Sequence, residues 1–217
     1  MPHDQLPTTG ASAPAPNVGA RADAAPAMER DRVFGLFLVL TGAVSWLASA
    51  VLVLERLELY RDPGYITSCD INPWVSCGRV MESWQAALFG FPNPLIGIVG
   101  FAVVVTTGMG MLAGARFATW WWVGFQTGIT LALVFVVWLW SQALYEINVL
   151  CIYCMVVWAM VVPLFVYTTA RNILRGVIPA GPALRRAAAE WPWVVVVLLI
   201  VLCAASIFFR FMNAFLG

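Results

Sequence analysis

Five long apolar runs constrain the fold of this chain more than any other feature of its sequence. The runs cover residues 33–54, 94–114, 117–140, 150–170 and 193–213. A helix of about 20 residues crosses the roughly 30 Å hydrocarbon core of a bilayer, so each run is long enough to span it. The runs are continuous rather than alternating, and a backbone in lipid must satisfy its own hydrogen bonds. The sequence therefore predicts an all-α integral membrane protein with five spans.

The composition agrees with a lipid environment. Hydrophobic residues make up 62% of the chain and charged residues 11%, and the mean hydropathy is +0.86, far above that of a water-soluble domain. All 12 basic residues are arginine and the net charge is +1, so no basic face is wide enough to follow a phosphate backbone. Membrane lipid is the predicted surrounding, and nucleic acid is excluded as a partner.

The apolar runs also divide the chain into segments. Residues 1–31 are rich in Ala and Pro and cannot bury enough apolar surface to offset the entropy of ordering, so they are predicted to form a disordered cytoplasmic tail. His3, the only histidine, lies in this tail, which excludes catalysis by an imidazole base. Residues 32–171 are predicted to form a bundle of four spans, 172–190 a cytoplasmic loop, and 191–217 the fifth transmembrane helix.

Arginines are distributed unevenly between the connections. Eight lie on one side of the predicted spans: Arg21, Arg30, Arg32, Arg116, Arg171, Arg175, Arg185 and Arg186. The other side holds Arg56, Arg61, Arg79 and Arg210. Because arginine is enriched in cytoplasmic loops, the N-terminus is predicted inside and the C-terminus outside. Segment 55–92 is then an external loop, and 141–149 a short external loop.

The first run also imitates a secretory signal. Arg30 and Arg32 precede it, and Ala-Ser-Ala at residues 48–50 resembles a cleavage site. The apolar sequence continues to residue 54, so an uncleaved helix is the favoured interpretation and cleavage is the alternative.

Four of the five cysteines fall on the predicted external side, where disulfides persist: Cys69, Cys77, Cys151 and Cys154. Cys151 and Cys154 are three positions apart at the start of a predicted helix, so both thiols lie on one face. The helix N-terminus stabilises a thiolate there. Cys154 lies about 4.5 Å deeper along the axis. Cys151 is therefore expected to face chemistry on the water side, and Cys154 a reactant that enters from the lipid.

Other interpretations of these cysteines carry less weight. A zinc or iron–sulfur site would need Cys69 and Cys77 as further ligands, and their spacing is not the usual short one. Covalent haem requires a histidine after the Cys-x-x-Cys, where this chain has Met155. A purely structural disulfide in the loop remains plausible. Cys203, within the fifth run, is predicted to be an inert buried thiol.

Three stretches resemble the motifs of the vitamin K epoxide reductase family: "CDINPWVSCGRVMES" at 69–83, "PNPLIG" at 92–97 and "CIYC" at 151–154. The resemblance implies a four-helix bundle around a quinone, here menaquinone or ubiquinone, with a fifth helix added. It also implies an external loop whose cysteine pair carries electrons to the bundle.

The resemblance further implies a role for each matched residue. Cys151 and Cys154 would be the active-site pair, with Cys154 next to the quinone, and Cys69 and Cys77 would be the shuttle pair. Asn93 would hydrogen-bond a quinone carbonyl; the alternative is that it merely caps the second span.

Three further positions concern the quinone site and the partner. Ser83 would lie in a half-helix that caps the site, or else be an ordinary polar residue of an interfacial segment. Trp158 stands where vertebrate members usually have a tyrosine, so it lines the quinone site without that hydroxyl. No thioredoxin-like domain follows the fifth span, which predicts a separate redox partner.

The sequence thus predicts a membrane thiol:quinone oxidoreductase that reoxidises a DsbA-like thioredoxin-fold partner and so drives disulfide formation in exported proteins. The all-arginine basic set and the Ala- and Pro-rich tail are typical of a high-GC bacterial gene, which favours disulfide formation. The predicted location is the bacterial cytoplasmic (inner) membrane. One alternative is reduction of a quinone or quinone epoxide for the sake of the quinone product. A second is a membrane scaffold with two structural disulfides.

Overall fold

The computed structural model describes residues 30–216, and their side chains as far as residue 212. The predicted disordered tail, residues 1–31 with His3, lies outside this part of the chain except for residues 30 and 31.

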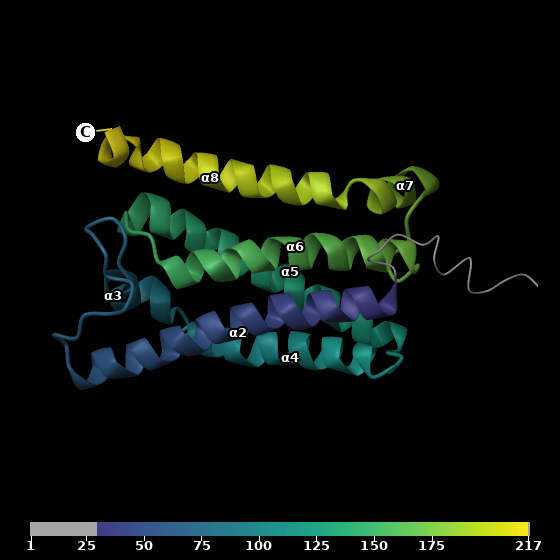
Figure 1. Ribbon diagram of the computed structural model, residues 1–217, viewed down its shortest axis with the longest axis horizontal. Coiled ribbons are helices and arrows are strands. Elements are labelled where there is room, and N and C mark those ends of the chain that lie inside the picture. The colour runs from purple at the N-terminus through teal and green to yellow at the C-terminus, as the bar shows by residue number, and fades with distance from the viewer. Residues whose placement is uncertain (1–29, 217) are drawn as a thin grey trace, which may run out of the picture.

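Long helices form a bundle with their axes roughly parallel (Figure 1). They are α2 (Asp31–Arg61), α4 (Pro94–Leu112), α5 (Thr119–Gln142), α6 (Ile152–Leu174) and α8 (Pro192–Leu216). Each is long and apolar enough to span a membrane. Between residues 30 and 216 there are no strands, only isolated bridges. The predicted all-α membrane protein with five spans is confirmed.

The remaining elements are short and lie at the two ends of the bundle. The α3 helix (Cys77–Glu82), the 3-10 turn η2 (Trp84–Ala87) and the π-helical turn η3 (Ala143–Ile147) lie at the end that carries both cysteine pairs, which we call the cysteine end. The α7 helix (Pro182–Glu190) and the start of α2 lie at the opposite end, which we call the arginine end.

The helices extend beyond the apolar runs where polar residues are tolerated. The α2 helix continues to Arg61, whose guanidinium pairs with Glu58 at 2.8 Å on an exposed face. Segment 141–149, expected to be a loop, is instead mostly helical, because α5 continues to Gln142 and passes directly into η3. Within the expected loop 172–190, α7 begins with a proline at its first helical position, where no amide donor is needed.

Packing is closest between α2 and α4. The α carbons of Gly35 and Gly108 face each other there, and a Cβ added to Gly108 would lie 2.7 Å from the Gly35 carbonyl oxygen. Small residues allow such an approach in lipid, where helix association depends on packing rather than on the hydrophobic effect. The other close helix pairs include α2 with α6, α5 with α6, and α6 with α8, whereas α4 and α5 are not a closely packed pair.

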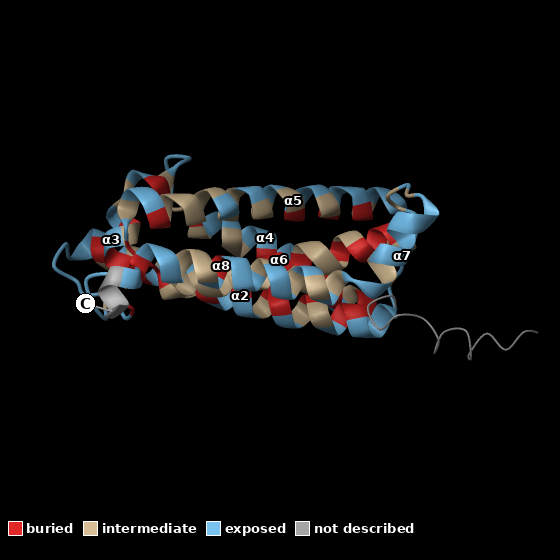
Figure 2. Ribbon diagram, turned by 90° about the horizontal axis from the view of Figure 1, so that it is seen from above, coloured by how far each residue is buried: buried red, intermediate tan, exposed pale blue. Residues whose placement is uncertain are grey.

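Buried side chains lie where the helices face one another, and the outward faces are exposed, as expected for surfaces that contact lipid (Figure 2). The core includes Phe34 and Leu38 of α2, Phe101 of α4 and Trp122 of α5. Arg171 of α6 stabilises this core at the arginine end. Its guanidinium lies 4.1 Å from the Trp122 ring centroid and pairs with Asp31 at 2.8 Å.

The close approach of α2 and α4 predicts an asymmetric response to alanine. Replacing Gly108 by Ala should destabilise the protein by about 1–3 kcal/mol, because backbone and Cβ atoms of α2 block the added methyl group. Gly100→Ala on the same helix is the control, since a Cβ there meets nothing within 4 Å. Equilibrium unfolding in SDS–detergent mixtures measures both. Equal stability of the two variants would contradict this packing.

Candidate active site

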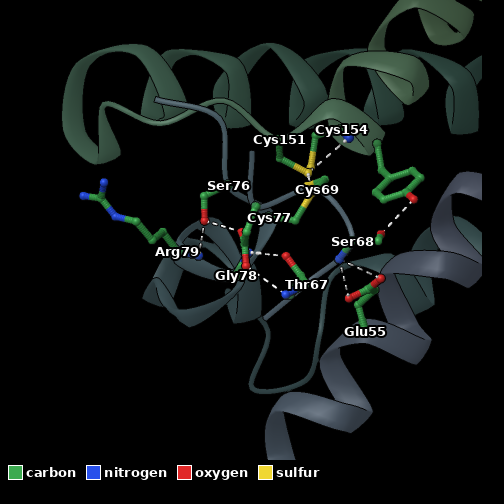
Figure 3. Close-up of a disulfide and its surroundings, with 12 residues drawn as sticks. Glu55, Thr67, Ser68, Cys69, Ser76, Cys77, Gly78, Arg79, Cys151 and Cys154 are labelled. Carbon is green, nitrogen blue, oxygen red and sulfur yellow. Dashed lines mark hydrogen bonds between the residues drawn. A yellow bond between two sulfur atoms is a disulfide. The ribbon is translucent and has the colours of Figure 1, made fainter. Parts of the chain in front are cut away.

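A short loop holds the first cysteine pair between α2 and α3. Cys69 and Cys77 form a disulfide with their α carbons 5.5 Å apart (Figure 3). Both residues are buried. The turn between them is set by Asn72, whose side-chain oxygen accepts hydrogen bonds from the amides of Trp74 and Val75 at 3.0 and 2.9 Å. The turn brings the two cysteines together at the start of α3.

Asp70 organises the same loop. Its carboxylate accepts hydrogen bonds from the Thr67 amide at 2.8 Å, the Gly78 amide at 3.1 Å and the Ser76 hydroxyl. Burial raises the pKa of Asp70, but these hydrogen bonds to its charged form outweigh burial and hold the pKa below the ordinary 3.8. In the sequence, Asp70 is one residue of the stretch 69–83 that resembles the family motif, and nothing in that stretch predicts this role.

The second cysteine pair lies where α6 begins. Cys151 occupies the N-cap position, and its sulfur accepts a hydrogen bond from the Cys154 amide at 3.3 Å. Free backbone amides and the positive end of the helix dipole favour a thiolate at such a position. Cys151 is therefore the thiol that the start of α6 stabilises most directly.

Backbone pairing joins the start of α6 to the disulfide loop. The Leu150 amide donates to the Trp74 carbonyl at 2.8 Å, and the Ser76 amide donates to the Leu150 carbonyl at 3.0 Å. These bonds fix the residue before Cys151 against the residue before Cys77. A second contact, between the hydroxyls of Ser68 and Tyr153 at 3.0 Å, lies beside the cysteines.

The pairing brings three sulfurs together. The sulfurs of Cys69, Cys77 and Cys151 lie within 4.8 Å of one another, and those of Cys77 and Cys151 are 3.2 Å apart. That separation exceeds a disulfide bond of about 2.05 Å and requires only a small movement for exchange. The trio is close enough to share a soft metal ion, but two of its members are joined to each other and offer no thiolate. The geometry therefore favours disulfide exchange.

Cys151 and Cys154 differ in their surroundings. Both residues line a cavity, but Cys151 is buried against the disulfide whereas Cys154 is exposed. Cys203, the remaining free thiol, is buried on α8.

A large apolar cavity of about 1110 Å³ extends from Cys154 between α2, α4, α5 and α6. Pockets for organic ligands commonly measure roughly 300–1,000 Å³, so a quinone ring with part of its tail fits. Gly100 of α4 and Gly124 and Gly128 of α5 line it and have open space where a side chain would stand. Size, apolar walls and an accessible thiol all match a lipid-soluble quinone.

Asn93 lies buried in the cavity wall just before α4. Its amide nitrogen donates to the Gln85 carbonyl at 2.6 Å, and its side-chain oxygen accepts from the Leu88 amide at 3.3 Å. It occupies the N-cap position, but its side chain does not cap α4. Asn93 instead ties the η2 turn to the start of α4, and one of its amide hydrogens has no partner among these bonds.

Ser83 and Trp158 also line the cavity. Ser83 lies between α3 and η2, where its hydroxyl donates to the Val80 carbonyl at 2.6 Å. Trp158 stacks on Trp140 of α5, with ring centroids 5.2 Å apart. Nothing in the sequence distinguishes Trp140 from the other aromatic residues near the span ends, so its place in this wall was not predicted.

The sequence was then compared with known proteins. Residues 36–169 match the model of the vitamin K epoxide reductase family. The chain belongs to this family. Its members are oxidoreductases, so the predicted family is confirmed, and so is the broader prediction that the protein is an oxidoreductase. The match leaves α7 and α8 outside it. A search of curated proteins found no match.

The carboxylate of Asp70 should make the disulfide loop sensitive to pH. Its native pKa lies below 3.8, so its stabilisation is complete above that value and is lost as the pH falls through the lower native pKa. Asp70→Asn should destabilise the loop by about 1–3 kcal/mol and abolish this pH dependence. Hydrogen exchange of residues 67–78 measures both effects. Asp62→Asn, at an exposed position nearby, is the control. The prediction would be contradicted if the Asp70 variant had the same pH profile as the wild-type protein.

Proposed function

We propose that this protein is a thiol:quinone oxidoreductase that reoxidises a DsbA-like thioredoxin-fold partner and passes the electrons to a quinone. The single observation that carries the proposal is the 3.2 Å separation of the Cys77 and Cys151 sulfurs, with Cys154 on the cavity wall beyond them. This arrangement connects a loop pair to a lipid-accessible cavity through one sulfur contact.

The first half of the reaction oxidises the partner at the loop. The partner's dithiol reduces the Cys69–Cys77 disulfide through a mixed disulfide, and the partner leaves with a disulfide of its own. Two electrons and two protons then reside on Cys69 and Cys77.

The second half transfers these electrons to α6. The Cys77 thiolate attacks the Cys151 sulfur of a Cys151–Cys154 disulfide, a Cys77–Cys151 bond forms, and Cys154 leaves as a thiolate. The Cys69 thiolate then attacks Cys77, which restores the loop disulfide and releases Cys151 as a thiolate. The described structure, with Cys69–Cys77 bonded and the other two thiols free, corresponds to this product state.

A bound quinone supplies an acceptor for two electrons and two protons. Cys154, exposed on the cavity wall, would face the quinone, and Cys151 would close the disulfide with Cys154 as the two electrons leave. The amide hydrogen of Asn93 that is not bonded to the Gln85 carbonyl would be available to a quinone oxygen. The stacked rings of Trp158 and Trp140 form an apolar wall. The Ser83 hydroxyl, which donates to the Val80 carbonyl, stabilises the break in the helix between α3 and η2. The proposed acceptor is menaquinone or ubiquinone.

The arginine distribution supports an orientation for this chemistry. Arg171 and Arg175 lie at the C-terminal end of α6, and Arg185 lies in α7 at the arginine end, which is proposed to face the cytoplasm of a bacterium. The cysteine end then faces the side to which proteins are exported. The partner is proposed to be a separate protein that docks there.

Turnover by the purified protein tests the proposal. The full chain in detergent receives a reduced thioredoxin-fold protein and either ubiquinone or menaquinone, and quinone absorbance is followed. Cys154→Ser and Cys151→Ser should each lower turnover to background, because each removes one atom of the redox-active disulfide. Cys203→Ser is the matched control and should retain full turnover.

The outcomes also separate the alternatives. A wild-type protein with intact cysteines and no turnover of either quinone would overturn the proposal. A Cys154→Ser variant that still reduces quinone would overturn the assignment of the quinone-facing thiol. Turnover that proceeds with a small dithiol but never with a thioredoxin-fold protein would favour a reductase that works for the quinone product.

Asn93→Asp tests the quinone contact. Aspartate keeps the acceptor for the Leu88 amide but removes both amide donors. Quinone KM should rise by about tenfold or more, because the donor proposed for the quinone and the hydrogen bond to the Gln85 carbonyl are both lost, while disulfide exchange with the partner remains unchanged. Steady-state kinetics with varied quinone measure the former, and stopped-flow mixing with the partner the latter. An unchanged KM would exclude Asn93 from quinone binding.

A further inference from the structure

The α8 helix carries an arginine near the cysteine end of an otherwise apolar span. Arg210 Nε donates a hydrogen bond to the Leu144 carbonyl at 2.9 Å, and its Nη2 donates to Oδ1 of Asn148. A charged side chain in a span is costly and marks a candidate functional position. Both acceptors belong to the turn that connects α5 to α6, not to α8 itself.

Each acceptor lies at a place in the turn where the local backbone is irregular. Leu144 lies in the final turn before the chain leaves η3, where backbone carbonyls have no partner further along the helix. Asn148 has a φ of 56°, a left-handed conformation that asparagine tolerates better than most residues. Its amide nitrogen donates to the Glu146 carbonyl at 3.2 Å. Arg210 therefore bonds the turn both before its sharpest bend, at Leu144, and at the bend itself, at Asn148.

An apolar cluster carries this constraint to the cysteines. Phe211 of α8 is buried together with Leu144 and Leu150, and Val75 of the disulfide loop packs against them. Leu150 is the residue whose backbone joins α6 to that loop. The position of the turn therefore sets how closely Cys151 approaches Cys77.

We propose that Arg210 is a positioning residue for sulfur exchange between Cys77 and Cys151, and that α8 is the support through which it acts. The proposal assigns a role to a helix outside the matched family region. The role of Arg210 in turnover rests on the proposed function, whereas its effect on the approach of the two sulfurs does not. Exchange requires in-line approach of the attacking sulfur, and a displacement of about 1 Å can slow a positioned reaction by roughly a hundredfold.

The test measures the effective concentration of one thiol toward the other. The full chain with Cys69→Ser, Cys154→Ser and Cys203→Ser retains only Cys77 and Cys151. Equilibration with reduced and oxidised glutathione, followed by mass spectrometry, gives the fraction with a Cys77–Cys151 disulfide. A loss of stability that leaves the protein folded does not change this ratio, whereas a displaced turn does.

Paired variants isolate the two hydrogen bonds. Arg210→Ala removes both donors. Asn148→Gly keeps the left-handed backbone but removes the acceptor, and Asn148→Asp keeps both the bend and the acceptor. Arg186→Ala on α7 is the control, because no hydrogen bond or ion pair of Arg186 exists among the described residues. Thermal unfolding identifies any variant that fails to fold, in which case the Asn148 pair decides.

The proposal expects Arg210→Ala and Asn148→Gly to lower the effective concentration by about tenfold or more, and Asn148→Asp and Arg186→Ala to stay within about twofold of the parent. Unchanged values for folded Arg210→Ala or for Asn148→Gly would overturn it, as would an equal fall in all four variants. Neither quinone nor partner takes part. If the proposed function is wrong, the wild-type protein shows no turnover, while Arg210→Ala still lowers the effective concentration.

Discussion

The contact between the Cys77 and Cys151 sulfurs depends on backbone pairing at the rim of a helical bundle. Lipid offers no hydrogen-bond partners, so the spanning segments satisfy their own backbones as helices and free backbone groups occur only at the ends. Segment 74–76 and Leu150 use such groups to pair with each other. The disulfide loop is thereby held over the start of α6, where the Cys151 thiol lies at a helix N-terminus and next to an apolar cavity.

The spans could be predicted from the sequence because hydropathy alone decides which segments enter lipid. Helix ends could not, since tertiary contacts decide them. The expected loop at 141–149 is largely η3, in which the Leu144 carbonyl accepts a hydrogen bond from Arg210 of α8. Nothing local in the sequence of 141–149 signals a partner that is so distant along the chain.

The candidate active site was likewise only partly predictable from the sequence. The spacing of Cys69, Cys77, Cys151 and Cys154 singled them out, and the structure places three of their sulfurs in one cluster with the fourth residue on the cavity wall. The supporting residues carry no such signal. Asp70 acts through three groups that converge only after the loop has folded, and Trp140 joins the wall by stacking on a residue of another helix.

The added helix also compensates for the cavity. A bundle in which α4 and α5 are not closely packed lacks internal contacts along one side, so its walls need support from elsewhere. Trp140, which stacks on Trp158 in the wall, donates its indole N–H to Ser206 of α8 at 3.3 Å. Arg210, one turn further along α8, holds the turn that leads to Cys151. One face of α8 thus supports both the cavity wall and the cysteine pair, so space for a large apolar ligand is compatible with a fixed distance between sulfurs.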